Sequence, residues 1–570
     1  MKHILFLFLF CIAFCTTAQV TNEVAPRSWS MIQKSTEQPA PVILPAIDIQ
    51  GLINENVQKP NGLSDKVLKV GQDISVAFDL YNSGTWTNLE NGDRIWRLNV
   101  KSVGSYFTRA NFDLFNVPEG AELYLYNDDK TDHIGPYTSS ENQDDGILGS
   151  WVIEGDNLWI EYFEPARVRG LGRISIDSIT HGFFDLFESS NGFNSKLNES
   201  GACNVDVLCN PNFNSNGSKD WSETRTDHLN AVARILIPRN GNLFVCTGSM
   251  IANTANNNTP YFLTANHCLD TTNGAGSNFN SSNWSFGFQW FTPTPDCATF
   301  SPTLGPNQPT RIISGARLLA NNDDSDFALF LLNQTPPSTW NLYYAGWDWS
   351  GSIPAEQLGM HHPNGDIMKL CRNDQAPTSQ KLPPSAAFLF RDGINLEIWR
   401  IADWDYGVTE GGSSGSFLLS EENLIIGQLA GGGAQCSGRF DNNAEDWYGR
   451  FDVSWDSGGT ASTRLRDWLD PLNTGSQKFE GSFASNLLSN QEVLIQPSIR
   501  IYPNPSSGIF NIDSDQQVAY QVFNLNGQLI VESAAGLSNN TLDLSSAANG
   551  LYFIKLTANG QTVTKKIIKQ

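Results

Sequence analysis

The sequence predicts an all-β protein that is built from several domains. Its 570 residues include 48 glycines and 27 prolines and few long amphipathic stretches, which argues against an all-helical protein. Short runs of alternating apolar and polar residues recur along the chain, as in strands with one buried face. Hydrophobic residues make up 40% and aromatic residues 11%, which is enough to fill cores and disfavours intrinsic disorder. At roughly 100 to 200 residues per domain, this length predicts three or four domains.

The charge balance excludes one large class of partners. The chain has 36 basic and 59 acidic residues, a formal net charge of −23. Such a surface repels phosphate backbones, so we expect no nucleic-acid binding.

The N-terminus predicts export. Lys2 and His3 precede an apolar run at residues 4–14, and small residues follow up to Ala18. This pattern is typical of a secretory signal peptide over residues 1–18, cut after Ala18. No later stretch reaches about 18 apolar residues, so no transmembrane segment is expected.

The rest of the chain divides by composition and periodicity. Residues 19–60 form an irregular lead-in, and short alternating runs separated by turn formers over residues 67–179 predict a β-sandwich. A second β-rich block covers about 200–482. A polar linker is expected at 483–498, and residues 499–570 alternate again and predict a small antiparallel sandwich.

The cysteines mark the middle block as a domain held by disulfides. Seven cysteines remain after removal of the signal peptide, and all lie between residues 203 and 436. Export implies an oxidising compartment, so they are disulfide candidates, with one thiol left over because the number is odd. Spacing alone leaves fifteen pairings of six cysteines open.

The few histidines narrow the search for a catalytic base. There are seven, none in a His-Glu-x-x-His pattern, and no Cys-x-x-Cys pair exists. We therefore expect no metal and no cofactor. His267 follows an apolar strand and directly precedes Cys268, for which Cys246 is a natural disulfide partner.

A glycine-rich segment at residues 410–416 (Glu-Gly-Gly-Ser-Ser-Gly-Ser) can expose the hydroxyl of Ser414 while nearby backbone N–H groups form an oxyanion hole. A serine nucleophile needs an imidazole to take its proton, and the imidazole needs a carboxylate to orient it. Asp326, at the start of the apolar run at residues 327–332, is the candidate carboxylate. Taken singly, each is more often a flexible turn, a structural histidine or a solvated cap.

These segments, in the order His, Asp, Ser, resemble the chymotrypsin-fold serine proteases, and more closely the bacterial lysyl endopeptidases. Further matching segments continue the likeness over about 200–482 and are listed here: residues 203–209, 253–256, 344–348, 361–364, 407–410, 426–429, 446–450 and 464–471. The resemblance implies a chymotrypsin-like double β-barrel at 197–482 and a serine endopeptidase acting through an acyl-enzyme. Ser414 would be the nucleophile, His267 the general base and acid, and Asp326 its orienting partner. The N–H groups of Gly412 and Ser414 would form the oxyanion hole.

The same resemblance implies the covalent framework, namely the disulfides Cys203–Cys436, Cys209–Cys297 and Cys246–Cys268. Cys371 is then the leftover thiol, and we expect it to be buried as a small apolar residue. Among the other histidines, we expect His361 and His362 to shape a loop and His228 to lie at the surface.

The resemblance also implies a specificity. A trypsin-like carboxylate six residues before the nucleophile is missing, because Val408 stands there, but Asp446 occupies the position that lysyl endopeptidases use. A carboxylate at the floor of this S1 subsite favours a cationic P1 side chain. Cleavage after lysine is the prediction. Ala430 stands where the family has a histidine, which leaves cleavage after both Lys and Arg as an alternative.

The flanking segments fit an exported precursor. Residues 19–196 resemble the family's propeptide, removed by self-cleavage after Lys196. Residues 499–570 resemble the C-terminal sorting domain of type IX secretion substrates, which implies that secretion machinery as a partner and a secreted or cell-surface location in a Gram-negative, Bacteroidota-type bacterium. Two alternatives remain open: an adhesive tail that stays attached, and a catalytically silent surface-binding protein.

Overall fold

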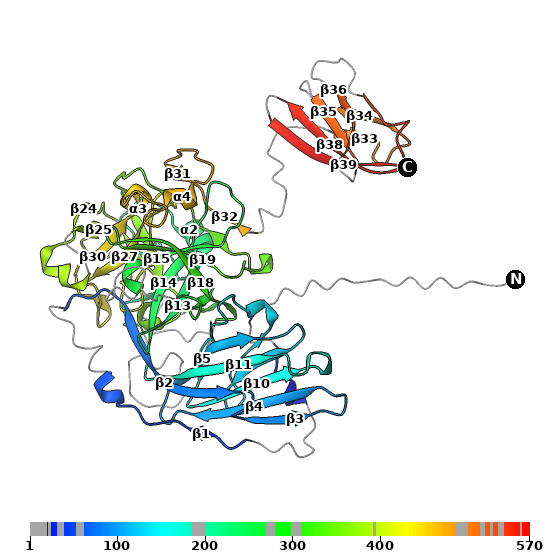
Figure 1. Cartoon of the computed structure of the whole chain (residues 1–570). Helices are drawn as coiled ribbons and strands as arrows, with labels where there is room; N and C mark the ends of the chain where they lie inside the picture. Colours follow the sequence, from blue (N-terminus) through cyan, green and yellow to red (C-terminus); the bar gives the residue numbers. More distant parts are fainter. Residues whose placement is uncertain are drawn as a thin grey trace. The chain divides into compact units, whose positions relative to one another are not determined.

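The computed structural model describes residues 20, 24–30, 39–52, 62–184, 200–269, 280–295, 297, 309–390, 395–484, 500–513, 519–524, 528–533, 541–558 and 561–570. They belong to two compact units, Met1–Ala484 and Ser485–Gln570 (Figure 1). The expected signal peptide and Lys196 lie outside the described residues. Within the described part, no helix is long and apolar enough to cross a membrane.

The first unit begins with a sandwich of two sheets around a shared apolar core. Alternation along the strands buries one face of each sheet against the other. One sheet contains β1 (Val42–Ile43), β3 (Thr85–Asn88), β4 (Arg94–Lys101), β6 (Glu122–Tyr126), β7 (His133–Tyr137) and β10 (Asn157–Glu164). The other contains β2 (Leu68–Asp79), β5 (Phe107–Asn116), β8 (Leu148–Gly149), β9 (Ile153–Glu154) and β11 (Arg173–Gly182).

The described residues between 232 and 332 form a closed antiparallel barrel. Its strands are β13 (Val232–Arg239), β14 (Asn242–Met250), β15 (Tyr261–Ala265), β16 (Ser285–Phe288), β17 (Arg311–Ser314), β18 (Ala316–Asn322) and β19 (Phe327–Leu332). The pairing runs from β16 through β13, β14 and β15 to β19. Gly315 alone separates β17, which pairs with β16, from β18, which pairs with β19, and this closes the ring.

Residues 357–450 form a second barrel on the same plan. Its strands are β22 (Gln357–His361), β23 (Lys369–Asn373), β24 (Thr378–Lys381), β25 (Glu397–Ile401), β26 (Phe417–Ser420), β27 (Ile425–Gly432) and β30 (Asp446–Arg450). Pairing runs from β22 through β26, β27 and β30 to β25, and the consecutive strands β23 and β24 pair with β22 and β25. Short α-helices lie before and after the two barrels in the chain: α2 (Ser222–His228), α3 (Phe451–Asp456) and α4 (Arg466–Leu469). The predicted all-β double barrel is confirmed.

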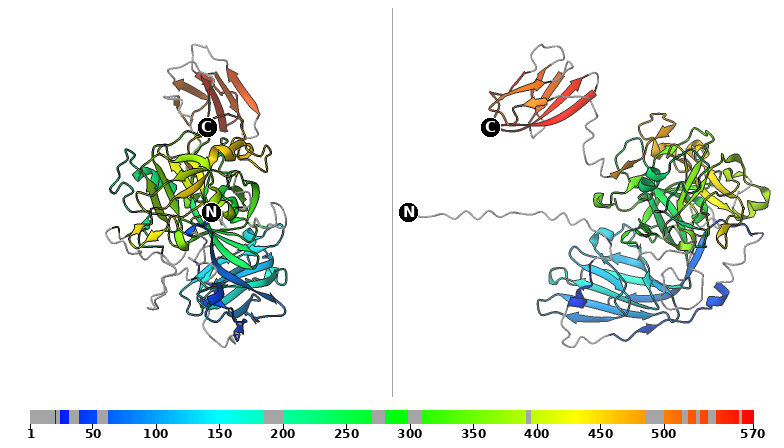
Figure 2. Two further views of the ribbon diagram at one scale, coloured as in Figure 1. Left: turned by 90° about the vertical axis from the view of Figure 1, so that its left-hand side faces the viewer. Right: turned by 180° about the vertical axis from the view of Figure 1, so that it is seen from behind.

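The sandwich and the first barrel share a sheet. Strand β2 pairs with β11 on one side and with β14 on the other, where Leu68 lies opposite Val245 and Gln72 opposite Asn242. Figures 1 and 2 show β2 running from the sandwich toward the barrels. Residues immediately before β2 are therefore carried to the barrel that holds His267.

The second unit is a small sandwich, as predicted. One sheet contains β33 (Arg500–Tyr502), β34 (Ile509–Asp513) and β37 (Thr541–Asp543), and the other contains β35 (Ala519–Phe523), β36 (Leu529–Ser533), β38 (Gly550–Ala558) and β39 (Gln561–Lys569). Side chains including Phe510, Val522 and Ile554 form its core.

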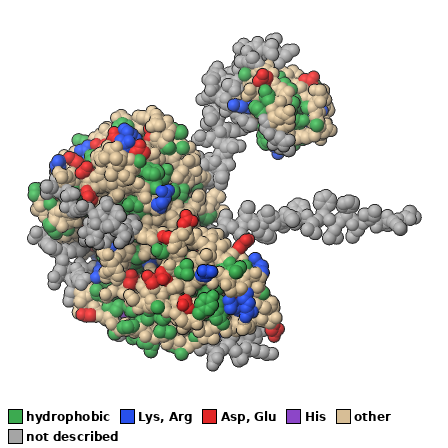
Figure 3. Space-filling view, viewed as in Figure 1, with side chains coloured by type: hydrophobic (Ala, Val, Ile, Leu, Met, Phe, Trp, Pro, Cys, Tyr) green, Lys and Arg blue, Asp and Glu red, His purple; other side chains and the backbone are tan. Residues whose placement is uncertain are grey.

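The expectation of a surface position for His228 is wrong. The last residue of α2 is only 1% exposed, and its ring lies against Tyr343 and Phe417. Its two ring nitrogens lie 2.9 Å from the Thr224 oxygen and 3.1 Å from the Asn423 oxygen. No histidine is visible on the face drawn in Figure 3.

Candidate active site

The pairing of two strands brings His267 and Asp326 together. His267 lies in the turn just after β15 and Asp326 just before β19, and Ala265 pairs with Phe327 between them. His267 Nδ1 lies 2.6 Å from Asp326 Oδ2, and the His267 backbone N–H donates to Oδ1 at 2.8 Å. Two contacts from one carboxylate fix both the imidazole ring and its backbone. Asp326 has φ +57°, a left-handed conformation that aspartate adopts more readily than most residues other than glycine.

Ser414 comes from the second barrel, on the loop before β26. Its Oγ lies 2.8 Å from His267 Nε2, so the three candidate residues form one chain of contacts. Thr247 of β14 anchors the loop: its N–H donates to the Ser414 oxygen and its hydroxyl to the Gly412 oxygen, each at 2.8 Å. Both barrels therefore position Ser414.

The loop requires its glycines. Gly412 and Gly415 have φ +91° and +81°. A Cβ at Gly412 would lie 2.7 Å from the His362 oxygen, and one at Gly415 would lie 2.1 Å from Thr264 Oγ1. Left-handed φ and close backbone approach both exclude side chains, which explains the glycines around Ser414.

His361 and His362 support this loop. Both are fully buried, and His361 Nδ1 lies 2.8 Å from the Ser413 hydroxyl, which also accepts from the Glu410 N–H. His362 Nδ1 lies 2.9 Å from the Asp366 oxygen. These contacts are with Ser413 and Asp366 rather than Ser414, and burial lowers the pKa of each imidazole to about 3.

The environment favours a protonated His267. Burial alone lowers its pKa, but the charge and hydrogen bond of Asp326, together with the charge of Asp65, outweigh burial and raise it above 6.5. Phe390 lies edge-on to the imidazole, with ring centroids 5.7 Å apart. An imidazole placed this way can take a proton from Ser414 and hold it as an imidazolium beside Asp326.

Asp446, at the start of β30, is fully buried, and two hydrogen-bond donors fix the orientation of its carboxylate. Its Oδ2 accepts from Trp404 Nε1 at 2.8 Å and from Thr409 Oγ1 at 2.6 Å, while its Oδ1 accepts no hydrogen bond. Burial raises the pKa of this carboxyl, an effect that the nearby Lys66 opposes. Gly432 leaves room for Asp446 Oδ1, because a Cβ on residue 432 would lie only 2.0 Å from that oxygen.

Asp446 has a charged partner that the sequence did not predict, Lys66. This side chain comes from the stretch before β2, is only 3% exposed, and places Nζ 3.7 Å from Asp446 Oδ1. The ammonium also donates to the backbone oxygens of Thr409, at 3.3 Å, and Ala434. No sequence signal separates this lysine from the others, because its partners lie more than 340 residues away.

The backbone of the same stretch lies along the site. The Gly412 N–H donates to the Lys66 oxygen at 2.5 Å. Ser64 and Gly432 exchange two backbone hydrogen bonds, of 3.0 and 2.9 Å. The Ser414 hydroxyl donates to the Asp65 oxygen. A lysine therefore fills the expected S1 subsite while its carbonyl contacts an expected oxyanion-hole donor.

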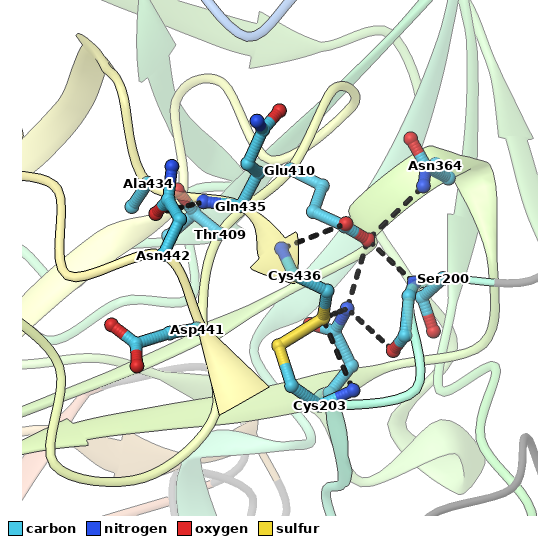
Figure 4. Close-up of a disulfide and its surroundings, with 12 residues drawn as sticks. Ser200, Cys203, Asn364, Thr409, Glu410, Ala434, Gln435, Cys436, Asp441 and Asn442 are labelled. Carbon is cyan, nitrogen blue, oxygen red and sulfur yellow. Dashed lines mark hydrogen bonds between the residues drawn. A yellow bond between two sulfur atoms is a disulfide. The ribbon is translucent and has the colours of Figure 1, made fainter. Parts of the chain in front are cut away.

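The disulfides hold segments around this site. The structure contains Cys203–Cys436, Cys209–Cys297 and Cys246–Cys268, and Cys371 is a buried free thiol. Figure 4 shows Glu410, which directly precedes the loop of Ser414, pointing toward Cys203–Cys436. Its carboxylate accepts from the N–H of Gly201 at 2.7 Å and from Asn364 and Asn204 at 3.0 and 2.9 Å. Among the described residues, no group of three or more His, Cys, Asp and Glu side chains could hold a metal ion.

Comparison with known families agrees with this geometry. Residues 197–449 match the family described as "Lysyl endopeptidase, C-terminal domain". The matched range includes the three contacting residues and Asp446. Residues 500–570 match the secretion system C-terminal sorting domain, which covers the second compact unit.

Individual proteins resemble parts of the chain. This chain is 29% identical over 287 residues to a lysyl endopeptidase of Pseudomonas aeruginosa, and the alignment covers 49% of this chain and 55% of that protein. It is 31% identical over 111 residues to beta-agarase D of Zobellia galactanivorans, covering 18% and 23%. The chain thus spans about half the length, or less, of these curated relatives.

Among solved structures, the protease Anisep from Arthrobacter nicotinovorans is similar, with a TM-score of 0.26 and 15% identity over 39% of this chain and 91% of that one. The thermostable serine protease AL20 has a TM-score of 0.26 and 14% identity over 40% and 92%. At these scores, neither likeness bears on function.

Proposed function

We propose that this protein is a secreted serine endopeptidase that hydrolyses peptide bonds on the carboxyl side of lysine. The observation that carries the proposal is the placement of Lys66, whose ammonium lies against Asp446 while its carbonyl oxygen accepts from Gly412. A substrate lysine bound in the same way would present its carbonyl to the loop of Ser414.

In the proposed mechanism, Ser414 Oγ attacks the carbonyl carbon of the P1 lysine while His267 Nε2 takes the proton of the Ser414 hydroxyl. Asp326 holds the imidazole and stabilises the imidazolium. The N–H groups of Gly412 and Ser414 would stabilise the tetrahedral oxyanion. His267 then gives the proton to the leaving amine, and a water molecule, activated by the same base, hydrolyses the acyl-enzyme.

The acceptors around the ammonium favour lysine over arginine. A lysine Nζ has three donors on a compact charge, and here it faces the Asp446 carboxylate and the oxygens of Thr409 and Ala434. A guanidinium is longer and planar, with five donors in a fixed fork. It would have to displace one of these backbone acceptors.

The flanking parts fit an exported precursor. We propose that residues 1–18 are a signal peptide, that residues 19–196 are a propeptide released by cleavage after Lys196, and that the sorting domain directs type IX secretion. The match of residues 500–570 to the secretion sorting family supports the last step.

Peptide mapping by mass spectrometry tests the activity. The processed protein would digest an unstructured substrate beside a Ser414→Ala control. Cuts only after lysine that are absent from the control support the proposal, and cuts after both Lys and Arg would limit it to a trypsin-like specificity. An absence of cuts by the processed form would favour the surface-binding protein instead.

A further inference from the structure

Residues 63–66 are held from both barrels, with the candidate active site between the two attachments. On one side, Ser64 pairs antiparallel with Gly432 at the end of β27. On the other, Leu68 pairs with Val245 of β14. An extended peptide that adds to sheet edges in this way gains backbone hydrogen bonds irrespective of its side chains.

Two side chains of this segment, Leu63 and Lys66, occupy separate sites on the second barrel. Lys66 enters the S1 subsite, and Leu63, three residues earlier, packs against an apolar cluster that includes Ala430 and Trp447. Leu63 Cδ2 lies 3.5 Å from the position that a Cβ on Gly433 would take. Ala430, which stands where the family has a histidine, thus forms part of an apolar surface for the P4 side chain.

The bound segment is not arranged for cleavage. A hydroxyl has one proton, and the Ser414 hydroxyl donates it to the Asp65 oxygen, one residue before the carbonyl of Lys66. That proton is then unavailable for transfer to His267. Lys66 has φ +60°, a left-handed conformation that a lysine rarely adopts, and its N–H donates to the Ser64 hydroxyl at 3.0 Å. These contacts hold the segment in a turned conformation in which Gly412 already donates to the Lys66 oxygen.

We propose that residues 63–66 are an internal ligand of the active site: they fill an apolar S4 subsite, a backbone-pairing S3 subsite and the lysine S1 subsite, and they keep the full-length chain inactive without being cut. The inference rests on the proposed function, because it takes Ser414 as the nucleophile. The ligand class is a tetrapeptide with an apolar P4 residue and a P1 lysine. Removal of this segment from the site is then a condition for activity.

The test measures the reactivity of Ser414 without a peptide substrate. An alkyl fluorophosphonate that carries a fluorophore modifies an activated serine whatever the P1 preference. The full chain would be labelled, and the band of uncleaved mass quantified on a gel over time. Lys66→Ala removes the ammonium, and Ser64→Pro removes the N–H that donates to Gly432. Lys101→Ala is the matched control, because Lys101 is partly exposed and pairs with Asp156 in the sandwich.

We expect the wild-type chain and Lys101→Ala to label slowly, and Lys66→Ala and Ser64→Pro at least tenfold faster. Thermal unfolding of each variant shows whether the fold is kept. The test needs only one of the two variants, Lys66→Ala or Ser64→Pro, to fold. Equal labelling of wild type and folded variants would overturn the inference, as would cleavage of the wild-type chain between Lys66 and Val67 found by mass spectrometry. Failure of every form to label, including the processed enzyme, would contradict the proposed nucleophile itself.

Discussion

The sharpest prediction concerns Asp446→Asn, which removes a charge from the proposed S1 subsite at almost constant volume. Lys66 Nζ lies 3.7 Å from Asp446 Oδ1, and we expect a substrate lysine to take a similar position. At an effective dielectric constant of about 20, two unit charges at this separation attract by roughly 4 kcal/mol. Since each 1.4 kcal/mol is a factor of ten, kcat/KM for lysine substrates should fall by about a thousandfold.

The assay compares kcat/KM of the processed enzyme on peptides that differ only at P1, with Lys, Arg, Gln or Met. Activity on Gln and Met should change little, because these side chains lack the charge that Asp446 attracts. Asp441→Asn is the control. This carboxylate lies on the hairpin in which Cys436 pairs with Asp441, and it accepts from the Asn443 N–H at 3.0 Å. A variant that keeps its preference for lysine would refute the assignment of Asp446 to the S1 subsite.

Three further predictions concern His267, the buried pair His361 and His362, and the surface that Leu63 contacts. The kcat/KM of the processed enzyme should fall as the pH drops through the pKa of His267, which Asp326 raises, because only the neutral imidazole accepts a proton; a stopped-assay pH profile measures this, and a profile flat down to pH 5 would contradict it. The folded domain should lose stability as the pH falls from 6.5 toward 3, because His361 and His362 stay neutral when folded and bind protons when unfolded. This costs on the order of 4 kcal/mol for each, and urea unfolding at several pH values measures it, with pH-independent unfolding as the contrary result. Substrates with leucine at P4 should be cut several-fold faster than those with aspartate there, as Leu63 indicates, and equal rates would count against an apolar S4 subsite.

Much of the fold could be predicted from local patterns. Alternating runs predicted both flanking sandwiches, and glycines around Ser414 predicted a tight loop, which the structure explains by left-handed φ and close backbone contacts. The surface position of His228 was predicted wrongly, because a histidine in a short polar helix gives no local sign that Tyr343 and Phe417 will cover it. Burial of such a residue depends on residues far away in the sequence.

The sequence by itself determined the all-β class, the order of the domains and the residue types of the candidate site, since these depend on periodicity and on chemistry at fixed short spacing. Only the tertiary structure decided that β2 pairs with β14 and that Lys66 meets Asp446. The Ser414 hydroxyl contacts a carbonyl 349 residues away in the chain. Contacts of this kind depend on how barrels close and sheets join, and no local pattern of residues encodes them.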